Sequence, residues 1–376
     1  MVNKESLNFA LMVLLAISML VSLVLVIKAS STLHSGEQVV PSGDSITISL
    51  TAIKPVGCEK CADVQQLIDA MEQTGSVNLS SKVVVNSDSA EGKALIKKYS
   101  FTRLPAMVLQ GDIDKLPSEN LERVGDAIVV RELPPPFYDI ENDTVSGLVD
   151  VTYITAPSCS KCKNITGLTA QLELMGIVVG KESQVAYDSD EGKALVKKFN
   201  ISAVPTAMFS SDAGYYPVFQ EAWDGIGTVD DGWYVMRALS APYFDFKTGG
   251  VRGIVSATFL NDSSCKDCYD PLLHKTIMAQ NFGITFDQEK VVDVNSDAGK
   301  ELVKKYTITA VPTIVMTGDV EAYPSFTQSW PDLGSSDGGV YVFRALDLIQ
   351  GMSYKNLTSG EVVANAEAAQ EPVVAG

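Results

Sequence analysis

The sequence predicts an α/β protein in which three similar domains follow one N-terminal membrane-spanning helix. Three observations in the 376 residues lead to this fold class. One unit of about 100 residues occurs three times, each copy contains a single Cys-x-x-Cys pair, and the chain begins with a long apolar run. A unit of this size is long enough to bury a core of its own, so three tandem domains are expected.

Residues 1–28 are predicted to form a membrane anchor, with residues 7–27 as the span. The run LNFALMVLLAISMLVSLVLVI has only Asn8, Ser18 and Ser22 as polar members. About 20 apolar residues cross the hydrocarbon core, whereas the apolar part of a cleaved signal peptide has only about 7 to 15. Because no later run is as long and apolar, we expect the rest of the chain on one side of the membrane.

Cysteine usage and sequons predict that this side lies outside the cytoplasm. All six cysteines occur in pairs, which suits an oxidising compartment where disulfides persist. The chain also contains six Asn-x-Ser/Thr sequons, the acceptor pattern for N-glycosylation. They begin at Asn78, Asn142, Asn164, Asn200, Asn261 and Asn356. We therefore expect a single-pass membrane glycoprotein with its ectodomain outside the cytoplasm.

The charge balance argues against nucleic acid as a partner. The formal net charge is −17, and a surface this acidic repels both nucleic acid and anionic lipid. The hydrophobic content of 46% and the charged content of 20% are ordinary for folded protein. We interpret the acidity as a property that keeps the surface soluble.

The repeated unit is clearest where a helix leads to a proline. The three copies read SDSAEGKALIKKYSFTRLPAMVL from Ser87, SDEGKALVKKFNISAVPTAMF from Ser189 and NSDAGKELVKKYTITAVPTIVM from Asn295. Their shared pattern is Gly-Lys-x-Leu-Ile/Val-Lys-Lys-Tyr/Phe, five further residues and then a proline. The interval from the first cysteine of each pair to that proline is 47, 46 and 47 residues. No insertion disturbs the unit, so the three copies should share one fold.

Each copy begins with a predicted strand, because the segment before the Cys pair is rich in β-branched and aromatic residues. These strands are Ile46–Ile53, Leu148–Thr155 and Gly253–Leu260. After the second cysteine, apolar residues recur at helical spacing, as at Val64, Leu67, Ile68 and Met71. A helix is therefore expected after each pair.

The second half of each copy continues the alternation. A strand reading KVVVN, SQVAY or KVVDV precedes the lysine-rich helix of the shared pattern, and another strand begins at the proline. A final helix is expected around residues 121–130, 233–239 and 340–348. Strands that alternate with helices at this spacing predict βαβ units, hence an open sheet with helices on its faces.

Shifts in composition predict the domain boundaries. We expect domains at residues 44–138, 145–244 and 251–350. The segments Pro134–Gly147 and Ala241–Gly253 are punctuated by proline and glycine and resemble each other, so we interpret them as linkers. Residues 364–376 have little to bury and are predicted to be a disordered tail.

A Cys-x-x-Cys pair between a strand and a helix has a specific chemistry. The first sulfur is expected at the helix N-terminus, where the unpaired N–H groups and the helix dipole favour the thiolate, which is the nucleophile. The second cysteine is close enough to attack a mixed disulfide formed by the first. The second copy fits best, because Lys161 and Lys163 add positive charge around Cys159 and Cys162.

Strand, Cys-x-x-Cys, helix and a proline that opens a later strand resemble the thioredoxin superfamily. The tandem arrangement is similar to protein disulfide isomerases and protein disulfide oxidoreductases, and the resemblance covers residues from about 44 to 350. It implies exchange with protein thiols or disulfides, with no cofactor. The implied catalytic residues are Cys58, Cys61, Cys159, Cys162, Cys265 and Cys268. The implied substrate-binding residues, with a cis bond before each proline, are Leu104, Pro105, Val204, Pro205, Val311 and Pro312.

The copies also depart from that family, and two other interpretations stay open. The inner dipeptides are Glu-Lys, Ser-Lys and Lys-Asp, and the position six residues before each first cysteine, often a carboxylate, is Ala52, Tyr153 or Phe259. One alternative is a binding or scaffold protein in which the pairs are structural disulfides. The other is metal binding, but each copy offers only two thiols, and His34 and His274 have no ligand spacing, so no metal is expected.

Overall fold

The structure is a computed structural model that describes residues 46–73, 77–116 and 121–365. The predicted anchor at residues 1–28 and the predicted tail from residue 366 onward lie outside the described residues. Among the helices that are described, none combines the length and the apolarity needed to span a bilayer. The membrane anchor therefore stays a prediction.

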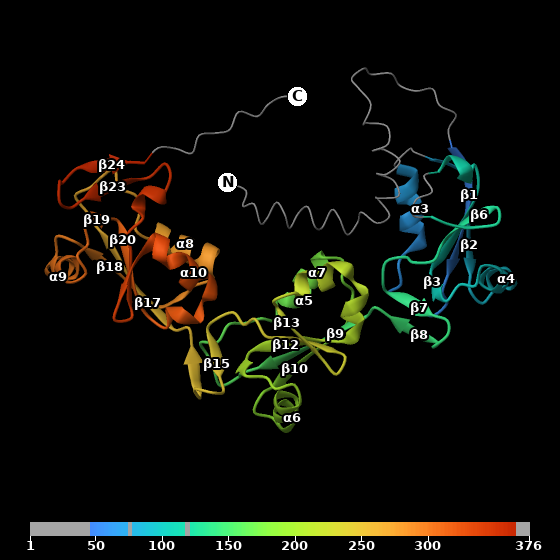
Figure 1. The fold of residues 1–376 in the computed structure, drawn as a ribbon, viewed down its shortest axis with the longest axis horizontal. Helices are drawn as coiled ribbons and strands as arrows, with labels where there is room; N and C mark the ends of the chain where they lie inside the picture. Colours follow the sequence, from blue (N-terminus) through green and yellow to red (C-terminus); the bar gives the residue numbers. More distant parts are fainter. Residues whose placement is uncertain (1–45, 74–76, 117–120, 366–376) are drawn as a thin grey trace, which may run out of the picture. The chain divides into compact units, whose positions relative to one another are not determined.

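Each repeat contributes one series of strands and helices (Figure 1). The first has β1 (Ile46–Lys54), α3 (Val64–Gln73), β2 (Val77–Asn86), α4 (Ala90–Tyr99), β3 (Arg103–Leu104), β4 (Ala106–Gly111), β5 (Glu122–Val124), β6 (Ala127–Val130), β7 (Phe137–Asp139) and β8 (Thr144–Ser146). The second has β9 (Val149–Thr155), α5 (Leu168–Leu174), β10 (Val179–Ala186), α6 (Asp190–Lys198), β11 (Ala203–Val204), β12 (Thr206–Phe209), α7 (Pro217–Trp223), β13 (Gly227–Asp230), β14 (Trp233–Met236), β15 (Tyr243–Asp245) and β16 (Gly250–Arg252). The third has β17 (Val255–Asn261), α8 (Leu273–Phe282), β18 (Phe286–Asp293), α9 (Asp297–Lys305), β19 (Ala310–Val311), β20 (Thr313–Gly318), α10 (Pro324–Leu333), β21 (Gly334–Asp337), β22 (Val340–Phe343), β23 (Ser353–Asn356) and β24 (Val362–Ala364).

A mixed five-stranded sheet is the centre of each repeat. The strand orders are β2-β1-β4-β6-β5, β10-β9-β12-β14-β13 and β18-β17-β20-β22-β21. In the first repeat β1 runs parallel to β2 and antiparallel to β4, and β17 has the same relations to β18 and β20 in the third. The three copies therefore share one topology, which confirms the expected α/β class.

Helices cover both faces of these sheets, as Figure 1 shows for α3 and α4. On one face, α3 buries Val64 and Ile68 against Leu50 of β1. On the other face, the core includes Tyr99 at the end of α4 and Ile53 of β1. Because alternate residues of a strand point to opposite faces, one apolar strand supplies both cores. The open sheet with helices on its faces is thus confirmed.

The repeated Ser-x-x-Gly sequence has a structural cause at the start of the second helix. Ser89, Ser189 and Ser296 are N-caps whose hydroxyl accepts from the N–H three residues later, at 2.9, 3.0 and 3.1 Å. Those N–H groups belong to Gly92, Gly192 and Gly299. A Cβ on these glycines would lie 2.1, 1.9 and 2.0 Å from a backbone oxygen at the end of the preceding strand. Only glycine lets the helix start this close to the sheet.

The final helices expected from the sequence are wrong. Residues 121–130 contain β5 and β6, 233–239 contain β14, and 340–348 contain β22 and one short 3₁₀ turn. In the second repeat, the two residues Asp231 and Gly232 have positive φ of 50° and 76° and join β13 to β14. Asp-Gly between apolar runs is a hairpin signal, and the apolar run after it was too short to separate strand from helix by periodicity.

The segments interpreted as linkers instead form β-hairpins. Residues 134–147 contain the pair β7 and β8, and residues 241–253 contain β15 and β16. A third hairpin, β23 and β24, extends the third repeat beyond residue 350 and includes Ala364, the first residue of the predicted tail. Each hairpin pairs with the short strand that precedes the proline of the shared pattern. The strand orders are β3-β7-β8, β11-β15-β16 and β19-β23-β24.

The chain forms two compact units, and segments of the second repeat belong to both of them. The predicted domain boundaries at residues 44–138, 145–244 and 251–350 are therefore not tested by this division.

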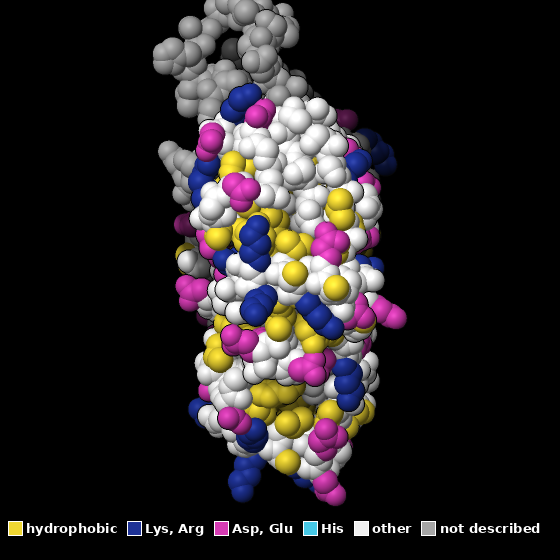
Figure 2. All heavy atoms as spheres, turned by 90° about the vertical axis from the view of Figure 1, so that its right-hand side faces the viewer, with side chains coloured by type: hydrophobic (Ala, Val, Ile, Leu, Met, Phe, Trp, Pro, Cys, Tyr) yellow, Lys and Arg dark blue, Asp and Glu magenta, His cyan; other side chains and the backbone are white. Residues whose placement is uncertain are grey.

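The charged side chains are mixed on the surface. On the face shown in Figure 2, Lys and Arg alternate with Asp and Glu, and hydrophobic side chains lie between them. No large area of this face carries one sign of charge. The expected lack of a nucleic-acid partner stays a prediction.

Candidate functional site

The three cysteine pairs form disulfides at equivalent positions. Each lies in the loop that follows the first strand of its repeat, after β1, β9 or β17. The bonds are Cys58–Cys61, Cys159–Cys162 and Cys265–Cys268, with Cα–Cα distances of 5.4, 5.4 and 5.5 Å. The predicted pairing of all six cysteines is thus confirmed.

The first sulfur of each pair does not lie at a helix N-terminus, contrary to the sequence-based expectation. Helices α3, α5 and α8 begin at Val64, Leu168 and Leu273, after turns that contain the pairs. In the second repeat, for example, the Cys162 N–H donates to the Cys159 carbonyl at 3.2 Å within such a turn. The effect of a helix dipole is confined to its first turn, so it gives these sulfurs little stabilisation as thiolates.

Solvent access differs among the pairs. Cys58 is buried, with 8% of its surface exposed, whereas the other five cysteines are half-buried. A macromolecular thiol can approach a half-buried sulfur more easily than a buried one, so the second and third pairs are the more accessible.

The predicted substrate-binding residues lie in the interior. The bonds Leu104-Pro105, Val204-Pro205 and Val311-Pro312 are cis, as expected, and all six residues are buried. The short strands before the prolines pair with the hairpins, so that Leu104 is opposite Tyr138, Val204 opposite Phe244 and Val311 opposite Lys355. The backbone edge that the resemblance assigns to substrate is therefore occupied by the chain itself.

The hairpins also bond to the Cys loops. In each repeat the backbone N–H of the residue after the second cysteine donates to a carbonyl at the start of the hairpin. These bonds are Ala62 to Pro136 at 3.4 Å, Lys163 to Pro242 at 2.7 Å and Tyr269 to Ser353 at 3.0 Å. The same strand therefore lies beside the disulfide loop and beside the strand that leads to the proline.

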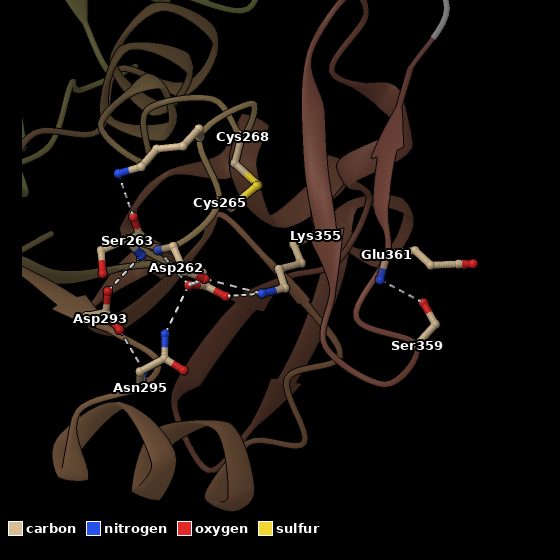
Figure 3. Close-up of polar contacts among 11 residues, drawn as sticks. Asp262, Ser263, Cys265, Cys268, Asp293, Asn295, Lys355, Ser359 and Glu361 are labelled. Atoms are coloured by element: carbon tan, nitrogen blue, oxygen red, sulfur yellow. Dashed lines mark hydrogen bonds and ion pairs between the residues drawn. A yellow bond between two sulfur atoms is a disulfide. The ribbon is translucent and has the colours of Figure 1, made fainter.

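The third repeat adds an ion pair between hairpin and loop, shown in Figure 3. Lys355 Nζ lies 2.6 Å from Asp262 Oδ2, and the Asp262 side chain is only 3% exposed. Asp262 also accepts from the Ser264 N–H at 2.9 Å and from Asn295 Nδ2 at 2.9 Å. Burial raises the pKa of Asp262, but the bonds from Lys355, Ser264 and Asn295 outweigh it and hold that pKa well below its usual range. The carboxylate is therefore charged and neutralised by Lys355.

A buried tyrosine and histidine connect the third Cys loop to its proline. Tyr269, directly after Cys268, donates its hydroxyl to the Pro312 carbonyl at 2.8 Å. The same hydroxyl lies 3.0 Å from Nε2 of His274, which is fully buried on α8. Burial lowers the pKa of His274 from 6.5 to about 4, against a smaller opposing effect of the Pro312 carbonyl. His274 is thus a neutral residue of the core.

Sequence reasoning missed Tyr269 and Lys355 as residues of this site. A signal for the third hairpin was present, since Tyr354, Lys355 and Asn356 repeat the aromatic-x-Asp/Asn pattern of Phe137–Asp139 and Tyr243–Asp245. In each copy the Asp or Asn side chain accepts from turn N–H groups, for example Asn356 Oδ1 from the Thr358 N–H at 2.8 Å. The pattern therefore marks the first strand and turn of a hairpin.

The interior near the pairs offers no carboxylate from the first strand. Ala52, Tyr153 and Phe259 are fully buried, and the Tyr153 hydroxyl is hydrogen-bonded to Thr169 Oγ1 at 2.6 Å. Within residues 46–73, 77–116 and 121–365, no three His, Cys, Asp or Glu side chains gather as a metal site would require. His34 lies outside the described residues.

Comparisons with known proteins give limited similarity. No family model and no curated protein sequence matches the chain. Among solved structures, ERdj5 form I is 9% identical with a TM-score of 0.16, and the match covers 77% of this chain and 40% of that chain. Human ERp44 is 8% identical with a TM-score of 0.14, covering 75% of this chain and 86% of that chain. The chain thus spans less than half of the ERdj5 structure, and TM-scores this low carry no argument about fold or function.

Proposed function

We propose that the chain is a membrane-anchored thiol–disulfide oxidoreductase with three thioredoxin-like domains, acting outside the cytoplasm on the thiols or disulfides of other proteins. The observation that carries the proposal is the position of the pairs. Three Cys-x-x-Cys disulfides occupy the same loop after the first strand, and each loop is bonded to a hairpin strand that pairs with the short strand leading into a buried proline.

The exchange conserves atoms and electrons. In the oxidising direction, a substrate thiolate attacks one sulfur of the pair, a mixed disulfide forms, and the other cysteine leaves as a thiolate. A second substrate thiolate then attacks the substrate sulfur of the mixed disulfide, which closes a substrate disulfide and releases the first cysteine. Two electrons pass from the substrate to the pair, and the two substrate protons pass to the two cysteines or to water. The reverse sequence reduces a substrate disulfide, with the N-terminal cysteine as nucleophile and its partner as resolver.

Stability alone is a weak reason for three such disulfides. The cysteines of each pair are separated by 3 positions, so each bond closes a very short loop. In the chain-entropy model this restricts the unfolded state by only about 2 kcal/mol, against about 4.7 kcal/mol for a 100-residue loop. A structural disulfide would be more effective between distant segments, so the short loops favour redox use.

The second candidate is a binding or scaffold protein, and the hairpin pairing favours it. Leu104, Val204 and Val311 have their strand edges filled by the chain itself. Reduction potentials separate the two functions. Values of about −120 to −270 mV belong to pairs that turn over, and values below about −300 mV to structural disulfides.

Trapping in the native host tests the oxidoreductase proposal. Cys61→Ala, Cys162→Ala and Cys268→Ala each remove a resolving thiol, so the remaining cysteine should hold substrates as mixed disulfides visible on non-reducing gels. We expect more adducts with Cys162→Ala and Cys268→Ala than with Cys61→Ala, because Cys159 and Cys265 are half-buried whereas Cys58 is 8% exposed. A membrane-impermeant reductant applied to intact cells should release them if the repeats face outward.

The matched control replaces both cysteines of a pair and should trap nothing. If none of the three variants traps a protein while the wild-type pairs resist mild reductant, the structural interpretation takes its place. Adducts that an impermeant reductant releases only after lysis would contradict the proposed location and leave the chemistry intact.

A further inference from the structure

In each repeat the loop that holds the disulfide is bonded to the first strand of the hairpin. This strand pairs with the short strand before the proline, a carbonyl at its start accepts a bond from the Cys loop, and its other edge pairs with the second strand of the hairpin. The ladder continues one residue further, where the N–H groups of Ile140, Phe246 and Leu357 donate to the carbonyls of Thr102, Ser202 and Thr309 at 2.9, 3.0 and 2.8 Å. The strand pairing, the bond from the Cys loop and the additional ladder bond occur in all three repeats, so they are a common feature of the repeat.

An extended protein chain is commonly recognised at an open strand edge, through the backbone N–H and C=O groups of that edge. Here those groups are already used. We propose that each hairpin is a cover that must unpair before a protein substrate can reach the disulfide beneath it, an inference that rests on the proposed function. Small thiols need no strand edge and reach the half-buried sulfurs with the cover in place.

Within the described part of the chain, the third cover has an ion pair that the other two lack. Lys355 of β23 pairs with the buried carboxylate of Asp262, three residues before Cys265 (Figure 3). The corresponding hairpin residues in the first two repeats are Tyr138 and Phe244, which carry no positive charge. Removing one member of a buried ion pair is costly because the other charge stays buried without its partner. Lys355 therefore offers a way to loosen one cover without changing a cysteine.

The test uses the full chain with the first two Cys pairs replaced by serine. Lys355→Met is compared with wild type in two measurements: hydrogen exchange of the β23 amides, and the rate at which Cys265–Cys268 oxidises reduced, unfolded ribonuclease A. If the cover must open first, both rates depend on the same opening equilibrium. We expect both to rise by one common factor of about tenfold or more. Reduction by dithiothreitol should change less than about threefold, since it bypasses the edge.

A second variant opens the cover by another route. Leu357→Pro removes the N–H that donates to the Thr309 carbonyl at 2.8 Å and leaves Asp262 and Lys355 unchanged. Hydrogen exchange of β17 shows whether either variant still folds. Lys300→Met, an exposed lysine of α9, is the control and should change neither rate.

The outcomes separate the cover from the function. Faster β23 exchange with an unchanged ribonuclease rate overturns the cover and leaves the oxidoreductase function standing. If dithiothreitol reduces the pair but no variant, open or closed, exchanges with ribonuclease, the proposed function itself fails for this repeat. Unchanged β23 exchange in Lys355→Met would show that the ion pair does not hold the cover.

Discussion

At the scale of single residues, the hydrogen bonds of Tyr269 determine the state of His274. The tyrosine hydroxyl has one proton and donates it to the Pro312 carbonyl at 2.8 Å. His274 Nε2, 3.0 Å away, must then be the donor to the tyrosine oxygen. This fixes the neutral tautomer with the proton on Nε2, and among the described residues its buried Nδ1 has no hydrogen-bond partner. Protonation of Nδ1 would bury a positive charge without a hydrogen-bond acceptor among these residues for the new N–H.

We therefore predict that His274 stays neutral down to acidic pH. Burial lowers its pKa from 6.5 to about 4, so between these values the unfolded chain binds more protons than the folded one. Stability of the third repeat should be complete above about pH 6.5 and should fall by about 3 kcal/mol as the pH decreases to about 4. NMR titration of the imidazole checks this, because the chain contains only two histidines.

A His34→Asn variant assigns the remaining signal to His274. Its nitrogen shifts should show the proton on Nε2 at pH 7, and His274→Leu should flatten the pH dependence of stability between pH 6.5 and 4. A titration of His274 near its ordinary pKa of 6.5 would mean that the site is open to water.

At the scale of elements, two glycines near helix starts in the second repeat should tolerate alanine very differently: Gly192 in the first turn of α6 and Gly167, the N-cap of α5. An Ala Cβ at Gly192 would lie 1.9 Å from the Ala186 carbonyl oxygen, so Gly192→Ala should destabilise the helix by about 1–3 kcal/mol. Gly167 has no atom within 4 Å of that position and a φ of −73°, so Gly167→Ala should stay within about 0.5 kcal/mol. Hydrogen exchange of the α6 amides measures the effect of Gly192→Ala, and exchange of the α5 amides measures that of Gly167→Ala. Equal effects would contradict the close contact.

Much of the fold could be predicted because the repeat reports each element three times. The first strands, the helix after each Cys pair and the lysine-rich helix all appear in the structure near their predicted positions. The last strands do not form the predicted helices. Runs such as Trp233–Met236 are shorter than two helical turns, so their periodicity does not distinguish a helix from a strand. The Asp-Gly turn before this run is the signal that indicates a hairpin strand. The helix starts were predicted best where the same N-cap serine and glycine recur in each copy, as at Ser189 and Gly192.

The site could be predicted less completely, because its remaining parts come from distant segments. Cysteine spacing alone predicted the disulfides. The contact between Lys355 and Asp262 joins residues 93 positions apart and depends on hairpin register, which no local pattern specifies. The predicted position of the helix start after each Cys pair was also wrong. A Cys-x-x-Cys sequence does not say whether the helix begins at the first cysteine or some residues later, as at Val64.

At the scale of the whole molecule, the hairpins change what counts as a complete repeat. Each hairpin pairs with the short strand that precedes the proline of the same repeat. The next repeat then begins within a few residues, as β9 does after β8. The segments between repeats therefore belong to the preceding repeat. A boundary at residue 244 divides β15 and removes β16, which pairs with it through Tyr243, Phe244 and Asp245.

Fragments of the second repeat test this boundary. We expect residues 145–253 to unfold cooperatively in urea, because this fragment contains the five-stranded sheet and the complete hairpin. Residues 145–244 should be less stable by about 1 kcal/mol or more, since they lack β16 and the Asp245 side chain, which accepts from the Thr248 N–H at 2.7 Å. Circular dichroism at matched concentrations gives both midpoints. Equal midpoints would show that the hairpin adds nothing to the domain. If neither fragment unfolds cooperatively, the repeats depend on one another, and the short strand at Val204 then needs more than its own hairpin to hold its place.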